Sequence, residues 1–500
     1  MTVAHHVFKP FDHLHETLGR IALGLLLSII STLLLTLAFP PYNFGWLIWV
    51  AFIPMLVAQY HVLPRQLTSL APAFAIGGWL GAFIFPIFGG RSLFMVLFPL
   101  AIAVIVLLTD KNKRAFHEQT SYRWFVLEGA LGWVGIEMIR GFIPAIGTWG
   151  FVGYTIWSAP WFLQPLSLFG IYALDLLIML GNYALAQFLF LFLGFPDSVP
   201  LPKPQATHWL MIFFLILCIW IGLSLSLFAA QPADPTFVRV AAIQPNLPRA
   251  AHRDKNITSE QRLTLVTDQI RAAADAGAQM IVLPEMIFNF DPQTSHTSKL
   301  RSIAAETNAY LVIGYVLESE AGFRNEVTIL SPAGEFLGIY GKTHPMITSG
   351  EPRTISAGQY PVYDTPIGRL ATMICFDADF TDVARRYGKQ GVQTITVPSL
   401  FGGALAEQTY TQIIFRAIEN RTAITMADVA FNSAIVDSYG HILQLDISPT
   451  GRQPMLLADV PLGTGKTLYS RIGDMFGWVS LAGMVLFVLF MNLRHPKKAL

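Results

Sequence analysis

Long apolar runs constrain this chain more than any other feature of its sequence. A helix of roughly 18 or more apolar residues can cross about 30 Å of hydrocarbon. Seven such runs precede residue 232 and an eighth closes the chain, at about 20–38, 43–60, 69–88, 92–109, 124–143, 163–190, 208–229 and 475–491. Because backbone polar groups in lipid must be satisfied within the segment, each run is predicted to form a transmembrane helix.

Seven spans before the polar region and one after it put both chain ends on one side of the membrane. Basic residues near the span ends are concentrated on that side, namely Lys9, Arg20, Arg65, Lys111, Lys113, Arg114, Arg123, Lys203, Arg494, Lys497 and Lys498, against Arg91 and Arg140 on the other. The positive-inside rule therefore predicts cytoplasmic termini and a periplasmic or extracytoplasmic polar region in a bacterial inner membrane. The first run lacks a small-residue cleavage site, so we expect a retained anchor.

Composition agrees with two regions of different chemistry. The chain is 53% hydrophobic, which is too apolar for a soluble enzyme, yet 13% of its residues are charged. We predict a transmembrane bundle over 1–232, an extracytoplasmic domain over 233–467, and a C-terminal helix with a cytoplasmic tail over 468–500. A net charge of +1 and the lack of a basic run with aromatics argue against a nucleic-acid partner. Without a close Cys/His cluster, neither a metal nor a cofactor is expected.

Several polar residues fall inside or near the apolar runs: Glu128, Glu137, Arg140, Asp175 and Asn182. Glu137 and Arg140 are three residues apart, so they share a helix face and can neutralise each other. A contact with a lipid headgroup or substrate is the alternative for this pair. An acid such as Asp175 is costly within an apolar helix, unless it lies near the interface and is solvated.

The polar domain alternates strand and helix patterns. Strands are predicted at 237–244, 280–285, 309–317, 325–330, 336–342 and 392–397, helices at 259–276, from Asp382 and at about 405–420, and a hairpin around 438–440. Ser259 is the expected cap of the first helix. This alternation is typical of sheets covered by helices, an α/β layered domain.

Three reactive residues, Glu285, Lys342 and Cys375, come at the ends of separate predicted strands. The only other cysteine, Cys218, lies in an apolar run, so Cys375 is expected to be a free thiol. A buried core cysteine is the alternative. A thiol with a pKa near about 8.5 becomes a nucleophile when an ammonium stabilises the thiolate and a carboxylate accepts the proton. Lys342 and the backbone N–H of Phe376 could stabilise an oxyanion.

The fragments Leu-Pro-Glu285, Tyr-Gly-Lys342 and Ile-Cys375-Phe-Asp resemble the nitrilase, or carbon–nitrogen hydrolase, superfamily. That resemblance implies an αββα sandwich whose site uses Glu, Lys and Cys. Segments in the apolar half resemble the apolipoprotein N-acyltransferase family more narrowly, at 37–46, 137–141, 149–154 and 170–174. The resemblance covers nearly the whole chain, so the implied fold is an eight-helix membrane bundle plus this sandwich.

The family resemblance also implies an activity and its residues. Cys375 would take an acyl chain from a phospholipid, typically phosphatidylethanolamine, as a thioester, with Glu285 as general base and Lys342 as oxyanion stabiliser. The acyl chain would then pass to the N-terminal amine of a diacylglyceryl-cysteine apolipoprotein. Glu351 matches a second acid that supports the site, with a solvated loop carboxylate as the alternative. The enzyme is expected to be a monomeric inner-membrane protein.

The sequence departs from the family pattern around the three residues. Phe376 stands where Tyr is usual and Asp377 where Glu is usual, while the loops 343–350 and 397–403 differ from the family norm. These departures put the substrate in doubt more than the type of reaction. Two alternatives are a membrane-tethered nitrilase-type amidase or hydrolase and a catalytically silent lipoprotein-binding scaffold.

Apolar residues in two of the loops around the three reactive residues suggest a lid. They are found at 286–290, directly after Glu285, and at 346–347, in the loop that follows Lys342. These residues either dip toward the membrane as a lid or cap the domain's own core.

Overall fold

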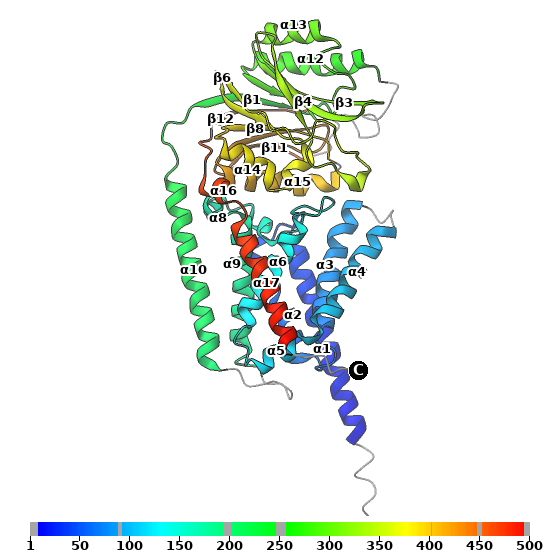
Figure 1. The fold of residues 1–500 in the computed structure, drawn as a ribbon, viewed down its shortest axis with the longest axis vertical. Coiled ribbons are helices and arrows are strands. Elements are labelled where there is room, and N and C mark those ends of the chain that lie inside the picture. The colour runs from blue at the N-terminus through cyan, green and yellow to red at the C-terminus, as the bar shows by residue number, and fades with distance from the viewer. Residues whose placement is uncertain are drawn as a thin grey trace, which may run out of the picture. The chain divides into compact units, whose positions relative to one another are not determined.

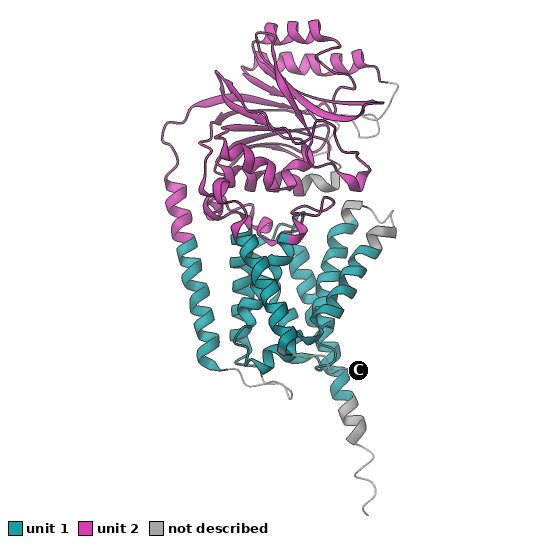
Figure 2. Ribbon diagram, in the orientation of Figure 1, with its two compact units in different colours: residues 1–138, 172–220, 476–500 teal, residues 139–171, 221–475 magenta. Residues whose placement is uncertain are grey.

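The chain forms two compact units in the computed structural model, which describes residues 9–88, 93–193, 202–246, 257–401, 403–447 and 453–494. Unit 1 comprises residues 1–138, 172–220 and 476–500, and unit 2 comprises residues 139–171 and 221–475 (Figure 2). The strands described below all belong to unit 2, and the long apolar helices lie largely in unit 1.

Helices dominate unit 1. They are α1 (Lys9–Ala38), α2 (Ile53–Val57), α3 (Leu70–Phe88), α4 (Leu93–Thr109), α5 (Lys113–Gln119), most of α6 (Phe125–Arg140), α9 (Ile171–Leu189), the first part of α10 (Lys203–Ala229), and α17 (Met475–Arg494). Within this unit α1 packs on α3 and α3 on α4. The exposed apolar side chains of α1 and α4, such as Leu26 and Leu108, are what a lipid-facing surface requires.

Five helical segments among the described residues are long and apolar enough to cross a membrane: His15–Ala38, Gly45–Val62, Ile171–Leu189, Lys203–Ala229 and Met475–Leu493. They coincide with five of the eight predicted runs. The other three runs also form helices, but α4 has 17 residues and α6 has 16, so eight spans are not confirmed. The membrane topology stays a prediction, and Arg91, Lys497 and Lys498 of its charge count lie outside the described residues.

The run predicted at 163–190 is interrupted in the structure. The helices α7 (Pro160–Leu163) and α8 (Leu166–Phe169) are short, and α9 starts only at Ile171. Gly170 between α8 and α9 has a φ of +72°, a left-handed conformation that ends α8 and suits glycine. The apolar helix is therefore shorter at its N-terminal end than its hydropathy suggests.

Polar side chains in unit 1 bind neighbouring groups of the same unit. The Asn182 amide donates to the Ile48 carbonyl at 2.8 Å, and its oxygen accepts the Phe52 N–H at 3.1 Å. Glu128 lies 3.6 Å from the Lys113 ammonium and 3.3 Å from His117. These contacts join segments far apart in sequence, so the buried polar residues connect the helices of unit 1.

Glu137 and Arg140 both have partners that the sequence did not suggest. Glu137 accepts a hydrogen bond from the Trp133 indole at 2.9 Å, one helical turn earlier. Arg140 belongs to unit 2 and donates to the backbone carbonyl of Trp149 in the same unit. Asp175 is fully buried, so the solvated alternative for this acid is wrong.

Two six-stranded sheets form the centre of unit 2 (Figure 1). The first has the order β12-β1-β2-β3-β4-β5 and the second β11-β10-β9-β8-β7-β6. Their strands are β1 (Phe237–Ile243), β2 (Met280–Val282), β3 (Tyr310–Ser319), β4 (Gly322–Leu330), β5 (Phe336–Gly341), β6 (Tyr363–Thr365), β7 (Gly368–Thr372), β8 (Thr394–Ser399), β9 (Ala423–Asp428), β10 (Ser433–Val436), β11 (Ile442–Asp446) and β12 (Met455–Pro461).

Helices cover the outer faces of both sheets, as the αββα prediction requires. Figure 1 shows α12 (Ser259–Asp275) and α13 (Thr297–Thr307) over the first sheet and α14 (Asp382–Lys389) and α15 (Gly403–Asn420) over the second. The apolar positions Leu263, Val266 and Ile270 of α12 recur at helical spacing and are buried in the core cluster of the first sheet. The helix α16 (Leu468–Ile472) follows β12.

The predicted cap of α12 is wrong by one residue. Thr258 is the cap: its side chain accepts the Gln261 N–H at 3.2 Å, and the Gln261 side chain accepts the Thr258 N–H at 2.8 Å. This reciprocal capping box satisfies two of the donors that a helix start leaves free, and Ser259 cannot reproduce it because the residue three positions further on is not Gln or Glu.

The segment 139–171 belongs to unit 2, whereas the sequence placed it in a bundle ending at residue 232. Its contacts supply the reason. The Thr148 N–H donates to the Asp379 carbonyl at 2.9 Å, and Gln164 donates to the Tyr439 carbonyl at 3.0 Å. Hydropathy alone cannot separate such a segment from the helices on either side of it.

Candidate active site

Each of the three reactive residues follows the end of a strand, two in the first sheet and one in the second. Glu285 follows β2, Lys342 follows β5 directly, and Cys375 follows β7 at the start of a 3-10 turn, Cys375–Asp379. The chain before Glu285 runs against β3, and a Cβ at Gly314 would come within 2.3 Å of the Pro284 carbonyl. Only glycine at position 314 lets this close approach occur.

Cys375 occupies a conformation that few side chains adopt. Its φ is +49°, in the left-handed region, which costs on the order of 1–3 kcal/mol for a residue with a side chain and is typical of functional sites. The thiol is 2% exposed. The charges of Glu285 and Lys342 both act on this thiol.

The resting form of Cys375 is the thiol. Burial raises its pKa well above the ordinary value, and the negative charge of Glu285 raises it further, while Lys342 acts in the opposite direction. Because Glu285 is close enough for its charge to act on the thiol, its carboxylate can accept the proton when the sulfur attacks. The buried core cysteine considered from the sequence is therefore buried next to a base.

Lys342 lies between two carboxylates. Its ammonium is 2.9 Å from Glu285 Oε1 and 2.8 Å from Glu351 Oε2. Burial alone would lower the pKa of Lys342, but the negative charges of Glu285 and Glu351 raise it well above the usual range. Lys342 therefore remains an ammonium at neutral pH, as a group that stabilises negative charge must.

Glu351 is not the solvated loop carboxylate that the sequence left open. Its side chain is only 8% exposed, and Oε2 also accepts the backbone N–H of Met346 at 2.8 Å. The loop that follows Lys342 therefore folds back and places a second acid beside the ammonium. The supporting position predicted for Glu351 fits this geometry.

Asn325 belongs to the same group, and the sequence did not single it out. Its Nδ2 donates to Glu285 Oε1 and to Glu351 Oε1, at 2.7 Å in each case. Its backbone carbonyl also accepts the N–H of Lys342 at 3.0 Å. An Asn at the start of a predicted strand carries no distinctive pattern, so only the pairing of β4 with β5 reveals this role.

Asp377 ties the cysteine turn to the lysine loop. One oxygen accepts the N–H groups of Thr343 at 3.1 Å and His344 at 2.7 Å. The other accepts the Tyr340 hydroxyl at 2.7 Å and the Ile374 N–H at 3.0 Å. Burial raises the pKa of Asp377 to about 6, although these hydrogen bonds oppose the increase. Asp377, which stands where Glu is usual in the family, thus uses both carboxyl oxygens to connect the cysteine turn with the lysine loop.

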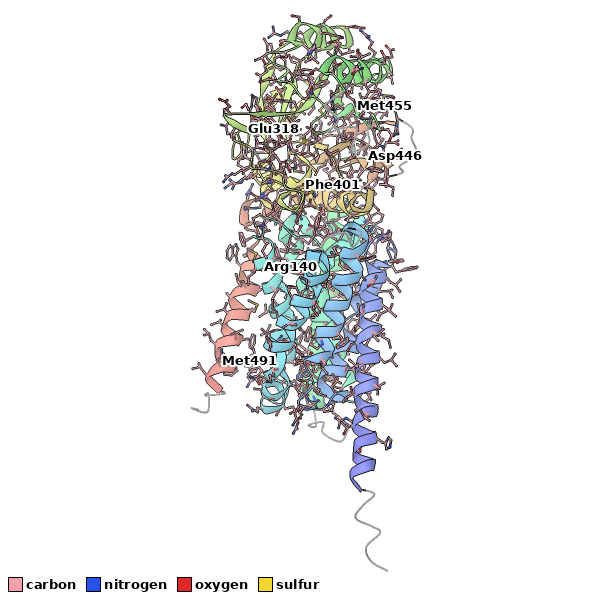
Figure 3. The ribbon with its side chains drawn as sticks, turned by 90° about the vertical axis from the view of Figure 1, so that its right-hand side faces the viewer. Arg140, Glu318, Phe401, Asp446, Met455 and Met491 are labelled. Carbon is pink, nitrogen blue, oxygen red and sulfur yellow. The ribbon has the colours of Figure 1, made fainter. Side chains whose placement is uncertain are left out.

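Phe376 is buried beside the turn. Its ring lies edge-on to Trp149 at 5.5 Å and to Phe380 at 5.3 Å between centroids. The oxyanion role of its backbone N–H stays a prediction. Phe401, in the divergent loop 397–403, lies beside α15 (Figure 3), and its N–H donates to Asp428 at 2.8 Å. Gly402 in that loop lies outside the described residues.

The two loops proposed as a lid differ. Ile287, Phe288 and Phe290 belong to the buried core cluster of the first sheet, so this loop caps the domain's own core. Met346 is also buried, but Ile347 next to it is 47% exposed. Only the loop after Lys342 therefore presents an apolar side chain outward.

A metal site does not appear among the residues that the structure describes. No group of three or more His, Cys, Asp or Glu side chains in these ranges could hold an ion. The Glu285, Lys342 and Cys375 side chains offer a proton acceptor, a fixed ammonium and a thiol nucleophile.

Comparisons with known proteins cover both units. A carbon-nitrogen hydrolase family model matches residues 239–468, and a model of the apolipoprotein N-acyltransferase N-terminal domain matches residues 31–184. An apolipoprotein N-acyltransferase from Geobacter metallireducens is 27% identical over a match that covers 92% of this chain and 93% of the relative. One from Thermotoga maritima is 24% identical, with 96% of each chain covered.

Amidases resemble only part of the chain. The omega-amidase NIT2 of Mus musculus is 28% identical over 36% of this chain and 77% of its own length. The solved structure of an amidase from Nesterenkonia sp. is 20% identical, covers 47% of this chain and 94% of that chain, and has a TM-score of 0.37. The acyltransferase relatives, by contrast, match nearly end to end.

Proposed function

Because this chain belongs to the apolipoprotein N-acyltransferase family of the carbon–nitrogen hydrolases, we propose that it moves a fatty acyl chain from a phospholipid to a lipoprotein amine. One observation carries the assignment of residues. The Lys342 ammonium is 2.9 Å from Glu285 Oε1, and the charges of both groups act on the buried Cys375 thiol. Nucleophile, base and fixed positive charge thus meet at one point.

The first half-reaction forms an acyl-enzyme. Glu285 accepts the Cys375 proton as the sulfur attacks the ester carbonyl of the phospholipid, and Lys342 stabilises the oxyanion. The tetrahedral intermediate then expels the glycerol oxygen, which takes the proton from Glu285 and leaves as a lysophospholipid. A thioester on Cys375 remains.

The second half-reaction uses the same residues in reverse. The α-amine of a diacylglyceryl-cysteine attacks the thioester, and Glu285 removes the proton that the new amide nitrogen loses. The sulfur leaves as a thiolate and recovers a proton from Glu285. Because donor and acceptor occupy the site in turn, the scheme is ping-pong.

The membrane region gives this chemistry its location. The described part of the chain contains five helical segments long and apolar enough to cross a membrane, and both proposed substrates carry acyl chains. We place the chain in the bacterial inner membrane with cytoplasmic termini and a periplasmic catalytic domain. Phosphatidylethanolamine is the proposed donor and a diacylated apolipoprotein the acceptor.

The acceptor step distinguishes acyl transfer from hydrolysis. Full-length protein in detergent, loaded from a phospholipid, should pass its acyl chain to a synthetic diacylated lipopeptide, and mass spectrometry should detect the triacylated product. The variant C375S should form none, while C218S, which alters the other free cysteine, should behave like the wild type. Rapid loss of the acyl group to water with no lipopeptide product would favour a hydrolase, and no acylation by any lipid would favour a binding scaffold.

A further inference from the structure

The segment 147–154 has no part in the proposed chemistry, yet it lies against the turn that carries Cys375. The N–H and the hydroxyl of Thr148 both donate to the Asp379 carbonyl, at 2.9 Å and 2.7 Å. The Trp149 indole N–H donates to the Asp379 carboxyl at 2.8 Å. Three hydrogen bonds therefore converge on Asp379, the last residue of the 3-10 turn that begins at Cys375.

The segment 147–154 lies in close contact with the Cys375–Asp379 turn. Gly147 has a φ of +54°, and a Cβ there would lie 2.8 Å from the Asp379 carbonyl. The Trp149 ring also meets the ring of Phe376, the residue after Cys375, at 5.5 Å and 78°. One indole thus contacts both the beginning and the end of the turn.

Asp379 is an unusual residue for a support. It is fully buried, and one carboxyl oxygen, Oδ2, has no hydrogen-bond partner within the described part of the chain. Burial raises the pKa of Asp379 well above its ordinary value, and the Trp149 hydrogen bond opposes this only in part. Asn at this position has the same shape and keeps the oxygen that accepts the indole N–H.

The other end of the segment is fastened to the same domain. Thr148 contacts the Tyr154 hydroxyl at 2.7 Å, and Arg416 of α15 donates to that hydroxyl at 3.2 Å. Arg416 pairs with Glu419 at 3.0 Å, and Glu419 accepts the N–H of Ile171, the first residue of α9, at 3.0 Å. The segment is thus held to α15 as well as to the cysteine turn.

We propose that Trp149 and Asp379 are positioning residues that hold the Cys375 turn in its left-handed conformation and so set the rate of the acylation step. This inference rests on the proposed function. A backbone strained at Cys375 needs surrounding contacts that over-determine it, and the Thr148 and Trp149 bonds fix the far end of its turn. Neither residue needs to contact the substrate for this role.

Conservative variants separate positioning from bulk stability. W149F keeps a ring against Phe376 and removes the indole donor, whereas D379N keeps an acceptor and D379L removes it. We expect W149F and D379L each to lower the single-turnover rate of Cys375 acylation by roughly 10-fold to 100-fold, as loss of a buried hydrogen bond implies. D379N should stay within about threefold of the wild type, with KM unchanged in every case.

A double-mutant cycle and a matched control complete the test. If the pair acts as a unit, the double variant W149F/D379L should be no slower than the slower single variant. W133F removes another indole hydrogen bond, the one to Glu137 in unit 1, and should leave the rate unchanged. Additive losses, a wild-type rate for W149F, or a defect confined to KM would overturn the proposal, since the last would make Trp149 a lipid contact.

A second readout needs no lipid. In a C218S background, a small haloacetamide should alkylate Cys375 more slowly in W149F and D379L than in the parent, and at the parent rate in D379N. Equal alkylation rates in all variants would contradict the positioning role. If the parent protein is alkylated normally but forms no acyl adduct with any phospholipid, the proposed function fails while the alkylation series still decides the positioning question.

Discussion

Asn325 offers a sharp test of how the two carboxylates are held. Its amide donates to Glu285 and to Glu351 at 2.7 Å each, and Lys342 is the ammonium that the two acids share. N325L removes both hydrogen bonds at similar volume. N325D keeps the shape but brings a third carboxyl into the group.

The pKa expected for the carboxyl that N325D introduces follows from the charges around it. At an effective dielectric constant of about 20, two unit charges about 4 Å apart interact by about 4 kcal/mol. Glu285 and Glu351 each repel the new carboxylate, and Lys342 attracts it. The net effect on the ionised form is therefore one repulsion of about 4 kcal/mol. At 1.36 kcal/mol per pKa unit, this raises the pKa of the introduced carboxyl by about 3, from about 3.9 to about 7.

Acylation of Cys375 should therefore become pH-dependent in N325D. Below about pH 7 the introduced acid is protonated and can donate one hydrogen bond, so single-turnover acylation should proceed at a reduced but measurable rate. Above about pH 7 the rate should fall by up to tenfold per pH unit relative to the wild type. N325L should be slower by about 100-fold at every pH, because about 3 kcal/mol of charge-assisted hydrogen bonding is lost. An N325D rate that follows the wild type from pH 5.5 to 8.5 would refute the reasoning.

Three further outcomes are expected. K342M should abolish detectable acylation, because it leaves two buried carboxylates without their shared ammonium; a stopped-flow or quench assay with near wild-type turnover would contradict this. The pKa of Asp377 is raised to about 6 and that of Glu419 to about 7 by burial, so the folded state holds protons that the unfolded chain releases nearer pH 4. The Tm in detergent should accordingly fall as pH rises from about 4 to 7 and E419Q should flatten that slope, whereas a Tm that rises over this range would disprove the linkage. Because Ile347 is exposed, I347D should raise the KM for the donor phospholipid without altering the alkylation rate of Cys375. An unchanged KM for the phospholipid would exclude a lid role for Ile347.

Much of the catalytic domain was predictable because its pattern is local. The strand-end positions of Glu285, Lys342 and Cys375 follow from buried strands followed by polar residues. That they meet depends on how the two sheets pack, because Cys375 follows a strand of the second sheet. The αββα fold expected from the resemblance is confirmed. The strands β6, β9 and β12 were not predicted. The strand β9 is buried along its whole length and so lacks the alternation that identifies a half-exposed strand, and β6 has only three residues.

The other features that the sequence did not reveal depend on contacts between segments that are distant in the sequence. Asn325 reaches both acids only because β4 pairs with β5. Trp149 meets Asp379 across 230 positions of sequence, and no periodicity encodes a contact of that range. The resemblance to the apolipoprotein N-acyltransferases is matched by family models and by relatives over more than 90% of the chain. The count of eight spans was not confirmed, because the apolar runs at 92–109 and 124–143 form helices of only 17 and 16 residues.

Single-turnover acylation of Cys375 is the measurement that tests the central claim most directly. The full chain in detergent, mixed with a phospholipid carrying an isotopically labelled acyl chain, should gain the mass of one acyl group. Peptide mapping should place that group on Cys375, and neutral hydroxylamine should remove it, as expected for a thioester. A labelled acyl group that maps to any other residue, or wild-type turnover by C375S, would contradict the assignment of Cys375 as the nucleophile.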